Sequence, residues 1–386
     1  MTFFMTSRLR VPTRFASFSP LAILATLVTL LALTGCDLFD SSQDGKSSPA
    51  DGVSGLTSSW IGTHRDSLTF AQSLGHHDGR LYVTHRHEDE PGTAVVDTAT
   101  GNIVAYYPHL LQPAGITFTS SGKAVVGEGT WGQPGGISVI DPGSGRIRQT
   151  VINFDQDNKV TTVDGRVYLF DRTLGTVTGF TGDVPGENVT LDVQTGAGSN
   201  PYGIAVVDGQ AYIPRYNLSS LLILGDVDAL DGGERDSVDL SPYAHAEGGD
   251  IPFMSLVTAH DGYVFVALQR YKADYSEQDS GLVVVIDAAT NTVAKTIGLN
   301  FKNPSSGFVK EGVWYIAGLG EYMALDGGVE KIDLAAREHA GTVVTEETLG
   351  GDVGDVVITG AGAGYVTTSS DFFVTTRVRK ISFQQP

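Results

Sequence analysis

The chain has 386 residues, of which 44 are acidic and 25 are lysine or arginine, so its formal net charge at pH 7 is −19. Three arginines and no acidic residue lie before residue 36, which leaves 22 basic and 44 acidic residues, a net charge of −22, in the remainder. We expect such a surface to repel nucleic acid and anionic lipid, which excludes DNA, RNA and polybasic membrane docking.

The N-terminal segment has the pattern of an export signal. Three arginines precede an apolar run, Leu21–Leu33, that is short for a membrane span. The run ends in Leu33-Thr34-Gly35-Cys36, which resembles a bacterial lipobox. This resemblance implies cleavage of residues 1–35 and lipidation of Cys36 with diacylglycerol and palmitate. It also implies attachment to a bacterial membrane outside the cytoplasm, at its periplasmic face or the cell surface.

Cys36 is the only cysteine of the chain, so no disulfide can form within it. Residues 36–58 are rich in serine, aspartate and glycine and lack apolar periodicity. This composition predicts a flexible tether between the anchor and a folded domain. Residues 59–386 are long enough for one domain with an ample core.

That domain contains a repeat in which a glycine opens a short strand whose fourth residue is usually aromatic. Successive glycines are 43, 43, 44, 53, 50 and 50 residues apart, at Gly79, Gly122, Gly165, Gly209, Gly262, Gly312 and Gly362. Such a period, built from short strands and Gly/Asp turns, is typical of β-propeller blades. We therefore predict an all-β, seven-bladed propeller of four-stranded antiparallel blades.

The second repeat shows the expected strands most clearly. They are residues 112–118, 123–127, 137–141 and 146–152, separated by glycine, proline and aspartate turns. A third-strand pattern, Val139-Ile140-Asp141 in this blade, recurs as Val95-Val96-Asp97 and Val285-Ile286-Asp287. These units resemble YVTN-type β-propeller repeats, as in bacterial surface-layer propellers, over nearly all of residues 60–386. The resemblance implies a fold and no particular reaction.

The two ends of the domain predict how the ring closes. The last repeat stops after three strands, and an unassigned segment, residues 60–64, precedes the first blade. We expect this segment to supply the fourth strand of blade seven, so that no blade edge stays open.

Two groups of residues are candidate metal ligands. His85 and His87 point the same way on one strand and are followed by carboxylates, although two imidazoles make only half a site. Asp226, Asp228 and Asp231 crowd a glycine-containing loop that suits Ca²⁺, but their spacing departs from an EF-hand. The alternative for the histidine pair is a solvated charged loop, and the alternative for the three aspartates is a plain acidic turn.

Four arginines, Arg86, Arg172, Arg215 and Arg270, follow the second strands of their blades at equivalent positions. Loops leaving the second strand share one propeller face with loops entering the first, so these arginines are expected around the channel mouth. The same loops carry aromatic residues: Trp131, Tyr216, Tyr271 and Tyr322. Arginine beside aromatic rings suits an anionic or flat, conjugated ligand. In the alternative interpretation, each arginine forms an ion pair with a neighbouring carboxylate and holds adjacent blades together.

These features predict a lipid-anchored binding protein for a small ligand or an envelope protein, with no catalytic residue assigned. The anchor and fold are similar to those of surface lipoprotein propellers that capture cofactors for a transporter. The first alternative is an envelope scaffold without a small ligand. The second is a metal-dependent hydrolase or lactonase using Glu128, Asn158, Asn303 and Asp352, whose local sequences give no support.

Overall fold

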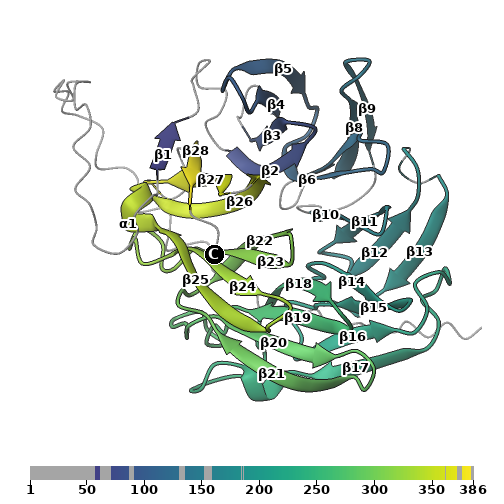
Figure 1. Cartoon of the computed structure of the whole chain (residues 1–386). Coiled ribbons are helices and arrows are strands. Elements are labelled where there is room, and N and C mark those ends of the chain that lie inside the picture. The colour runs from purple at the N-terminus through teal and green to yellow at the C-terminus, as the bar shows by residue number, and fades with distance from the viewer. Residues whose placement is uncertain are drawn as a thin grey trace, which may run out of the picture. The chain divides into compact units, whose positions relative to one another are not determined.

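The computed structural model describes residues 57–60, 71–86, 91–129, 135–151, 159–183, 185, 187–360, 362–371 and 376–383. These residues belong to one compact unit, Val53–Pro386, in which 28 β-strands form seven four-stranded antiparallel sheets. The sheets surround a central channel as the blades of a β-propeller (Figure 1). The predicted fold class is confirmed.

Within blades 1 to 6 the strands follow one another in chain order from the channel outwards. Blade 1 contains β2 (Ala71–His77), β3 (Arg80–His85), β4 (Gly92–Asp97) and β5 (Ile103–Pro108). Blade 2 contains β6 (Pro113–Phe118), β7 (Ala124–Glu128), β8 (Gly136–Asp141) and β9 (Arg146–Val151). Blade 3 contains β10 (Lys159–Val163), β11 (Arg166–Asp171), β12 (Thr176–Phe180) and β13 (Val189–Gln194).

The second half of the ring repeats this order and adds two short helices. Blade 4 contains β14 (Ala205–Val207), β15 (Gln210–Ile213), β16 (Ser220–Leu224) and β17 (Arg235–Asp239), followed by the 3₁₀ helix η2 (Ser241–Tyr243). Blade 5 contains β18 (Met254–His260), β19 (Tyr263–Leu268), β20 (Leu282–Asp287) and β21 (Thr292–Gly298). Blade 6 contains β22 (Pro304–Lys310), β23 (Val313–Gly318), β24 (Gly328–Asp333) and β25 (Glu338–Thr345), followed by α1 (Glu346–Leu349).

Blade 7 contains strands from both ends of the domain. β26 (Asp352–Gly360), β27 (Ala363–Ser369) and β28 (Thr376–Ser382) come from the C-terminal end, and β1 (Thr57–Trp60) pairs antiparallel with β28. Figure 1 shows β1 beside β28. The predicted closure by an N-terminal strand is therefore confirmed, although this strand ends at Trp60, where the prediction had it begin.

The repeated glycines are required by the hairpins that join the first two strands of each blade. All seven have positive φ angles, between 69° and 84°. In five blades the preceding residue, such as Asp78 or Asp208, also has a positive φ, of 47° to 52°. Two successive positive φ angles make a type I′ turn, whose twist matches that of the flanking strands and which favours an Asp-Gly pair.

The aromatic residue of each repeat fills the space between neighbouring blades. Six such residues are almost completely buried: Tyr82, Tyr168, Tyr212, Phe265, Tyr315 and Tyr365. Each buried apolar cluster joins residues of two adjacent blades; Tyr212, for example, packs with Val264 and Val284 of blade 5. The core is therefore a ring of inter-blade layers, and each blade depends on both of its neighbours.

Candidate functional site

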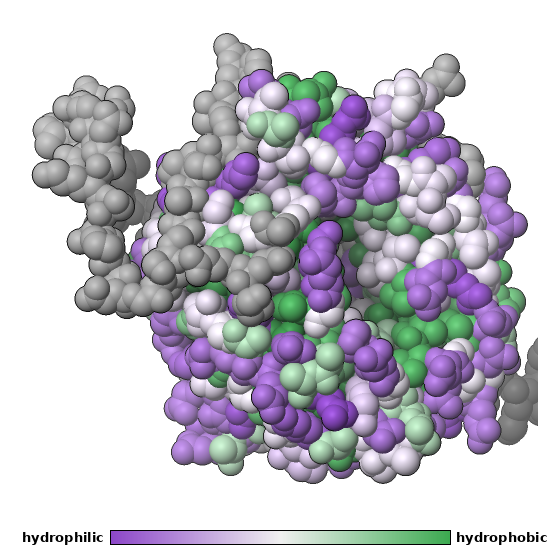
Figure 2. Space-filling view, viewed as in Figure 1, coloured by the Kyte–Doolittle hydropathy of each residue, from purple (hydrophilic) through white to green (hydrophobic). Residues whose placement is uncertain are grey.

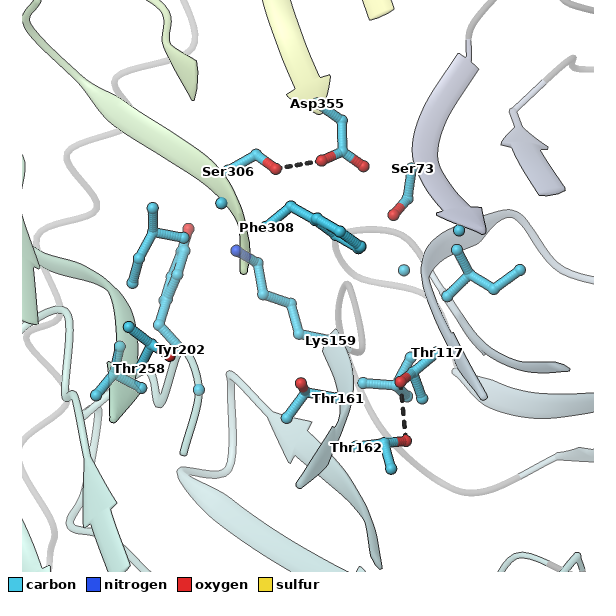
Figure 3. A pocket seen from close by; sticks show the side chains of 18 of the residues that line it. Ser73, Thr117, Lys159, Thr161, Thr162, Tyr202, Thr258, Ser306, Phe308 and Asp355 are labelled. Atoms are coloured by element: carbon cyan, nitrogen blue, oxygen red, sulfur yellow. Dashed lines mark hydrogen bonds between the residues drawn. The ribbon is translucent and has the colours of Figure 1, made fainter. Parts of the chain in front are cut away.

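The inner strands of the seven blades enclose a channel cavity of about 810 Å³. One face of the propeller is hollowed near its centre (Figure 2). Many residues of the cavity wall carry hydroxyl groups, among them Ser73, Thr117, Thr161, Thr162, Thr258 and Ser306 (Figure 3). Because a hydroxyl both donates and accepts hydrogen bonds, this wall can contact a polar ligand from several sides.

Asp355 connects three blades at the wall of the channel cavity. Its carboxylate accepts hydrogen bonds from the Leu74 backbone N–H of blade 1, at 2.7 Å, and from the Ser306 hydroxyl of blade 6. Burial raises the pKa of Asp355 above its ordinary value, while the hydrogen bonds from Ser306 and Leu74 oppose this shift. These contacts give Asp355 a structural role in closing the ring.

Lys159 and Arg172 of blade 3 both pack against the ring of Tyr202 at the channel cavity. Lys159 Nζ lies 3.9 Å and Arg172 Cζ 4.4 Å from the ring centroid. Arg172 also donates hydrogen bonds to Asn200 Oδ1, at 2.8 Å, and to the Tyr202 hydroxyl, at 2.7 Å. Figure 3 shows the Lys159 side chain extending into the channel. Two cations beside one aromatic ring can contact an anionic ligand with a flat body.

The four arginines expected at the mouth separate into two pairs. Arg86 and Arg172 line the channel cavity, and Arg86 Nε donates a hydrogen bond to the Pro113 carbonyl at 3.0 Å. Arg215 and Arg270 instead hold loops together. Arg215 donates to loop carbonyls, including that of Thr195 at 3.1 Å. Arg270 donates to two loop carbonyls and forms an ion pair with Asp279 at 3.0 Å.

A second cavity, of about 790 Å³, lies among the loops of blades 4, 5 and 6. Three aromatic residues expected at the mouth, Tyr216, Tyr271 and Tyr322, line this cavity together with Tyr275. The structure therefore places Arg86 and Arg172 in one cavity and these three tyrosines in the other, and neither lining contains Arg215 or Arg270.

A chain of aromatic rings runs from the channel cavity to the second cavity. Tyr202 stacks on Tyr216 with ring centroids 4.8 Å apart, and Tyr216 meets Phe253 edge-on at 5.2 Å. Phe253 in turn contacts Tyr271 at 5.8 Å and Tyr275 at 5.2 Å. Because such pairs stabilise one another beyond the burial of their surface, the loops that carry them form a fixed wall.

The hydroxyls of Tyr216 and Tyr271 in this wall stay protonated at physiological pH. Burial, followed by the influence of neighbouring tyrosines such as Tyr322, raises the pKa of Tyr271 to about 12. Burial raises the pKa of Tyr216 as well, and its hydroxyl donates to Gln269 Oε1 at 2.6 Å. Neutral phenols can donate hydrogen bonds to a ligand while their rings offer apolar surface.

Glu128 does not share the mouth with the arginines. It is buried, accepts hydrogen bonds from the Ser138 hydroxyl, and lies against the ring of His109, whose other nitrogen is 2.8 Å from the Thr93 hydroxyl. Strand β7 ends at Glu128, and the Glu128 side chain lies between blades 1 and 2. There these polar partners offset the free-energy cost of burying the carboxylate.

Three of the predicted site residues lie outside the described residues: the lipidation candidate Cys36, the aromatic residue Trp131 and the metal candidate His87. His85 is buried and its ring centroid lies 5.4 Å from that of Tyr106.

In the acidic loop, Asp226 accepts the Asp228 backbone N–H at 2.8 Å, Asp228 forms an ion pair with Arg166, and Asp231 accepts the Gly233 N–H at 3.1 Å. Within the described ranges, no three His, Cys, Asp or Glu side chains are grouped to hold a metal ion.

No protein-family model matches this sequence, and no curated protein is similar to it. In structure, by contrast, 1006 solved chains match it, so the fold is common and points to no single activity. Streptogramin B lyase has 11% sequence identity and a TM-score of 0.58, over 85% of this chain and 98% of its own.

Two further solved structures show the same likeness. U3-55K has 8% identity and a TM-score of 0.59, over 84% of this chain and 98% of its own. The computationally designed protein Ika8 has 13% identity and a TM-score of 0.50, over 83% of this chain and 98% of its own. The likeness is one of fold. At these identities it shows the β-propeller and no shared activity.

Within the described part of the chain, no helix is both long and apolar enough to cross a bilayer.

Proposed function

We propose that this propeller is a non-catalytic binding protein that holds a small, anionic, flat ligand in its channel cavity. The observation that carries this function is the position of Lys159 and Arg172, 3.9 and 4.4 Å from the Tyr202 ring at the wall of that cavity. Arg86 lines the same cavity and adds a third cation.

The chemistry of these groups favours an anion over a neutral ligand. A guanidinium and an ammonium form charge-assisted hydrogen bonds with carboxylate or phosphate oxygens, and such bonds are about twice as strong as neutral ones. Since residues 36–386 carry a net charge of −22, a cationic cluster in the channel stands out against its surroundings. The hydroxyl groups of the wall supply further partners for ligand oxygens.

Calorimetric titration of the full chain with 2-naphthoate and with its neutral analogue 2-naphthamide tests this function. We expect the carboxylate to bind more tightly, and Lys159→Gln with Arg172→Gln to weaken its binding at least about tenfold, because each charge-assisted bond contributes roughly 1.5–3 kcal/mol. Equal binding of the two probes, or equal binding by the variant, would contradict it and favour the envelope scaffold.

We also propose that Cys36 carries the lipid anchor and that the propeller works outside the cytoplasm. The lipobox-like segment before Cys36 supports this location. Growth with labelled palmitate should label the wild-type chain and leave Cys36→Ser unlabelled. Label on the variant, or none on the wild type, would overturn the anchor and leave the channel site unaffected.

A further inference from the structure

We propose a second ligand site, in the second cavity, that takes an organic cation with an alkylated ammonium head. This cavity lies between the loops at 270–279 and 320–322 and contains neither Lys159 nor Arg172 in its lining. The site is therefore separate from the anion site and can be tested without it.

Half-exposed tyrosine rings provide the apolar surface of this cation site. Tyr275 is 58% exposed and Tyr322 is 51% exposed, and both line the cavity. The ring of Tyr275 is supported from behind by Phe253 and Tyr271, with centroids 5.2 and 5.5 Å away. Aromatic faces attract cations through their quadrupole, by about 0.5–1 kcal/mol per ring at exposed sites.

Carboxylates outnumber ammonium groups around the same cavity. Its lining contains Glu247, Glu277, Asp279 and Glu321, against Lys302 as the lysine or arginine among the described residues that line it. Each of these carboxylates has a cationic partner: Glu247 and Glu277 share Lys272, at 3.7 and 3.4 Å, Asp279 pairs with Arg270 at 3.0 Å, and Glu321 pairs with Lys302. Four carboxylates thus face three cations, and because such exposed pairs are weak, the remaining negative charge can attract a cationic ligand.

The backbone of the surrounding loops is held in an unusual conformation. Phe253, Tyr275, Met323 and Leu325 have φ angles of 56°, 60°, 63° and 55°. A left-handed conformation costs bulky side chains on the order of 1–3 kcal/mol each and persists where the surrounding structure enforces it, often at ligand sites. The aromatic contacts of Phe253 and the hydrogen bond from Met323 N–H to Asp352, at 2.8 Å, supply this support. The loops are thus shaped before a ligand arrives.

An alkylated ammonium group fits this combination better than a simple apolar group does. Its methyl groups can pack on the tyrosine rings while its charge remains near the carboxylates, and it needs no hydrogen-bond acceptor. A small ion such as NH₄⁺ would lose its hydration without gaining comparable ring contact. Both the rings and the negative charge are needed for this selectivity.

Saturation-transfer NMR on the full chain, with choline and its neutral isostere 3,3-dimethylbutan-1-ol as probes, tests the cation site. We expect transfer to the choline methyl groups and at least about tenfold weaker binding of the alcohol. Tyr275→Leu with Tyr322→Leu should abolish the transfer, and Glu247→Gln with Glu277→Gln should weaken it. Tyr106→Leu, which changes a partly exposed tyrosine on blade 1, is the matched control and should bind choline normally.

Two results would overturn the cation site. Equal binding of choline and the alcohol would show that the cavity is merely apolar, and full binding by the tyrosine double variant would place the cation elsewhere. Binding of 2-naphthoate by the same double variant reports on the anion site separately and shows that the ring is folded. Failure of one site is therefore distinguishable from failure of the other.

Discussion

Arg172 and Arg270 occupy equivalent positions, directly after the second strands of their blades, yet their surroundings differ. Arg172 lies beside Tyr202 at the channel cavity, whereas Arg270 binds two loop carbonyls and Asp279. The sequence predicts the positions of both residues because the strand repeat fixes them. It cannot predict which one turns towards the channel, since that depends on partners in loops that do not repeat.

Alanine substitution should separate the roles of these two arginines. Arg270→Ala removes the side-chain donor of two carbonyls and the arginine partner of Asp279, which keeps the Ala246 N–H. We therefore expect the free energy of unfolding to fall by about 1.5–3 kcal/mol while 2-naphthoate binding is kept. Arg172→Ala should weaken 2-naphthoate binding. Denaturant unfolding and calorimetric titration of both variants check this. Loss of binding in Arg270→Ala alone would reverse the assignment.

Glu346 makes the stability of the ring depend on pH. It is fully buried at the start of α1 and accepts the backbone N–H groups of Gly327, at 2.9 Å, and Val353, at 2.7 Å. Burial raises its pKa from 4.5 to about 7. Because the folded state holds this proton more tightly than the unfolded state, its contribution is complete below about pH 4.5 and is lost as pH rises to about 7.

We expect the free energy of unfolding to decline across this window, with Glu346 accounting for about 3 kcal/mol. Glu346→Gln cannot titrate, so its decline between pH 5 and pH 8 should be smaller than that of the wild type by this amount. Denaturant unfolding at several pH values measures the difference in slope. Identical slopes would mean that Glu346 does not hold a proton in the folded state.

At the scale of elements, the blade hairpins were predictable and the loops were not. The glycines, the Asp-Gly turns and the buried aromatic residues repeat because every blade needs the same turn and the same inter-blade filling. Lys159, at the start of β10, and Phe253, before β18, belong to the site but were missed. Their neighbours in space, Tyr202 and Tyr216, come from other blades, and no local pattern indicates such contacts.

Strand β1 should control the stability of the whole ring, because its pairing with β28 closes blade 7. Neighbouring N–H groups of an antiparallel strand point to opposite sides, so Ser58→Pro with Ser59→Pro must remove one donor that faces β28. We expect a loss of about 1–3 kcal/mol in a single cooperative transition, measured by calorimetry.

The matched control for this experiment is Ser47→Pro with Ser48→Pro, in the segment predicted to be a tether, and it should unfold as the wild type does. A separate low-temperature transition in the β1 variant, with the main transition unchanged, would show that blade 7 opens alone. In that case the ring would not depend on its closing strand.

At the scale of the whole molecule, the ring brings together residues that are far apart in sequence. Ser73, Lys159, Tyr202 and Asp355 come from four blades and line one cavity. The repeat period predicts that such a channel exists, since seven blades must surround one. The chemistry of the channel follows from inward-facing positions that vary from blade to blade, which is why the repeat does not predict the ligand class that we propose.

Native mass spectrometry of the full chain, purified gently from its own cells, tests the central claim most directly. The wild type should retain a non-covalent ligand of drug-like or smaller size, suited to a cavity of about 810 Å³. Lys159→Gln with Arg172→Gln, purified in parallel, should lose this anionic ligand. A wild-type chain without any bound mass, or equal retention by the variant, would contradict binding of an anion at the Tyr202 site.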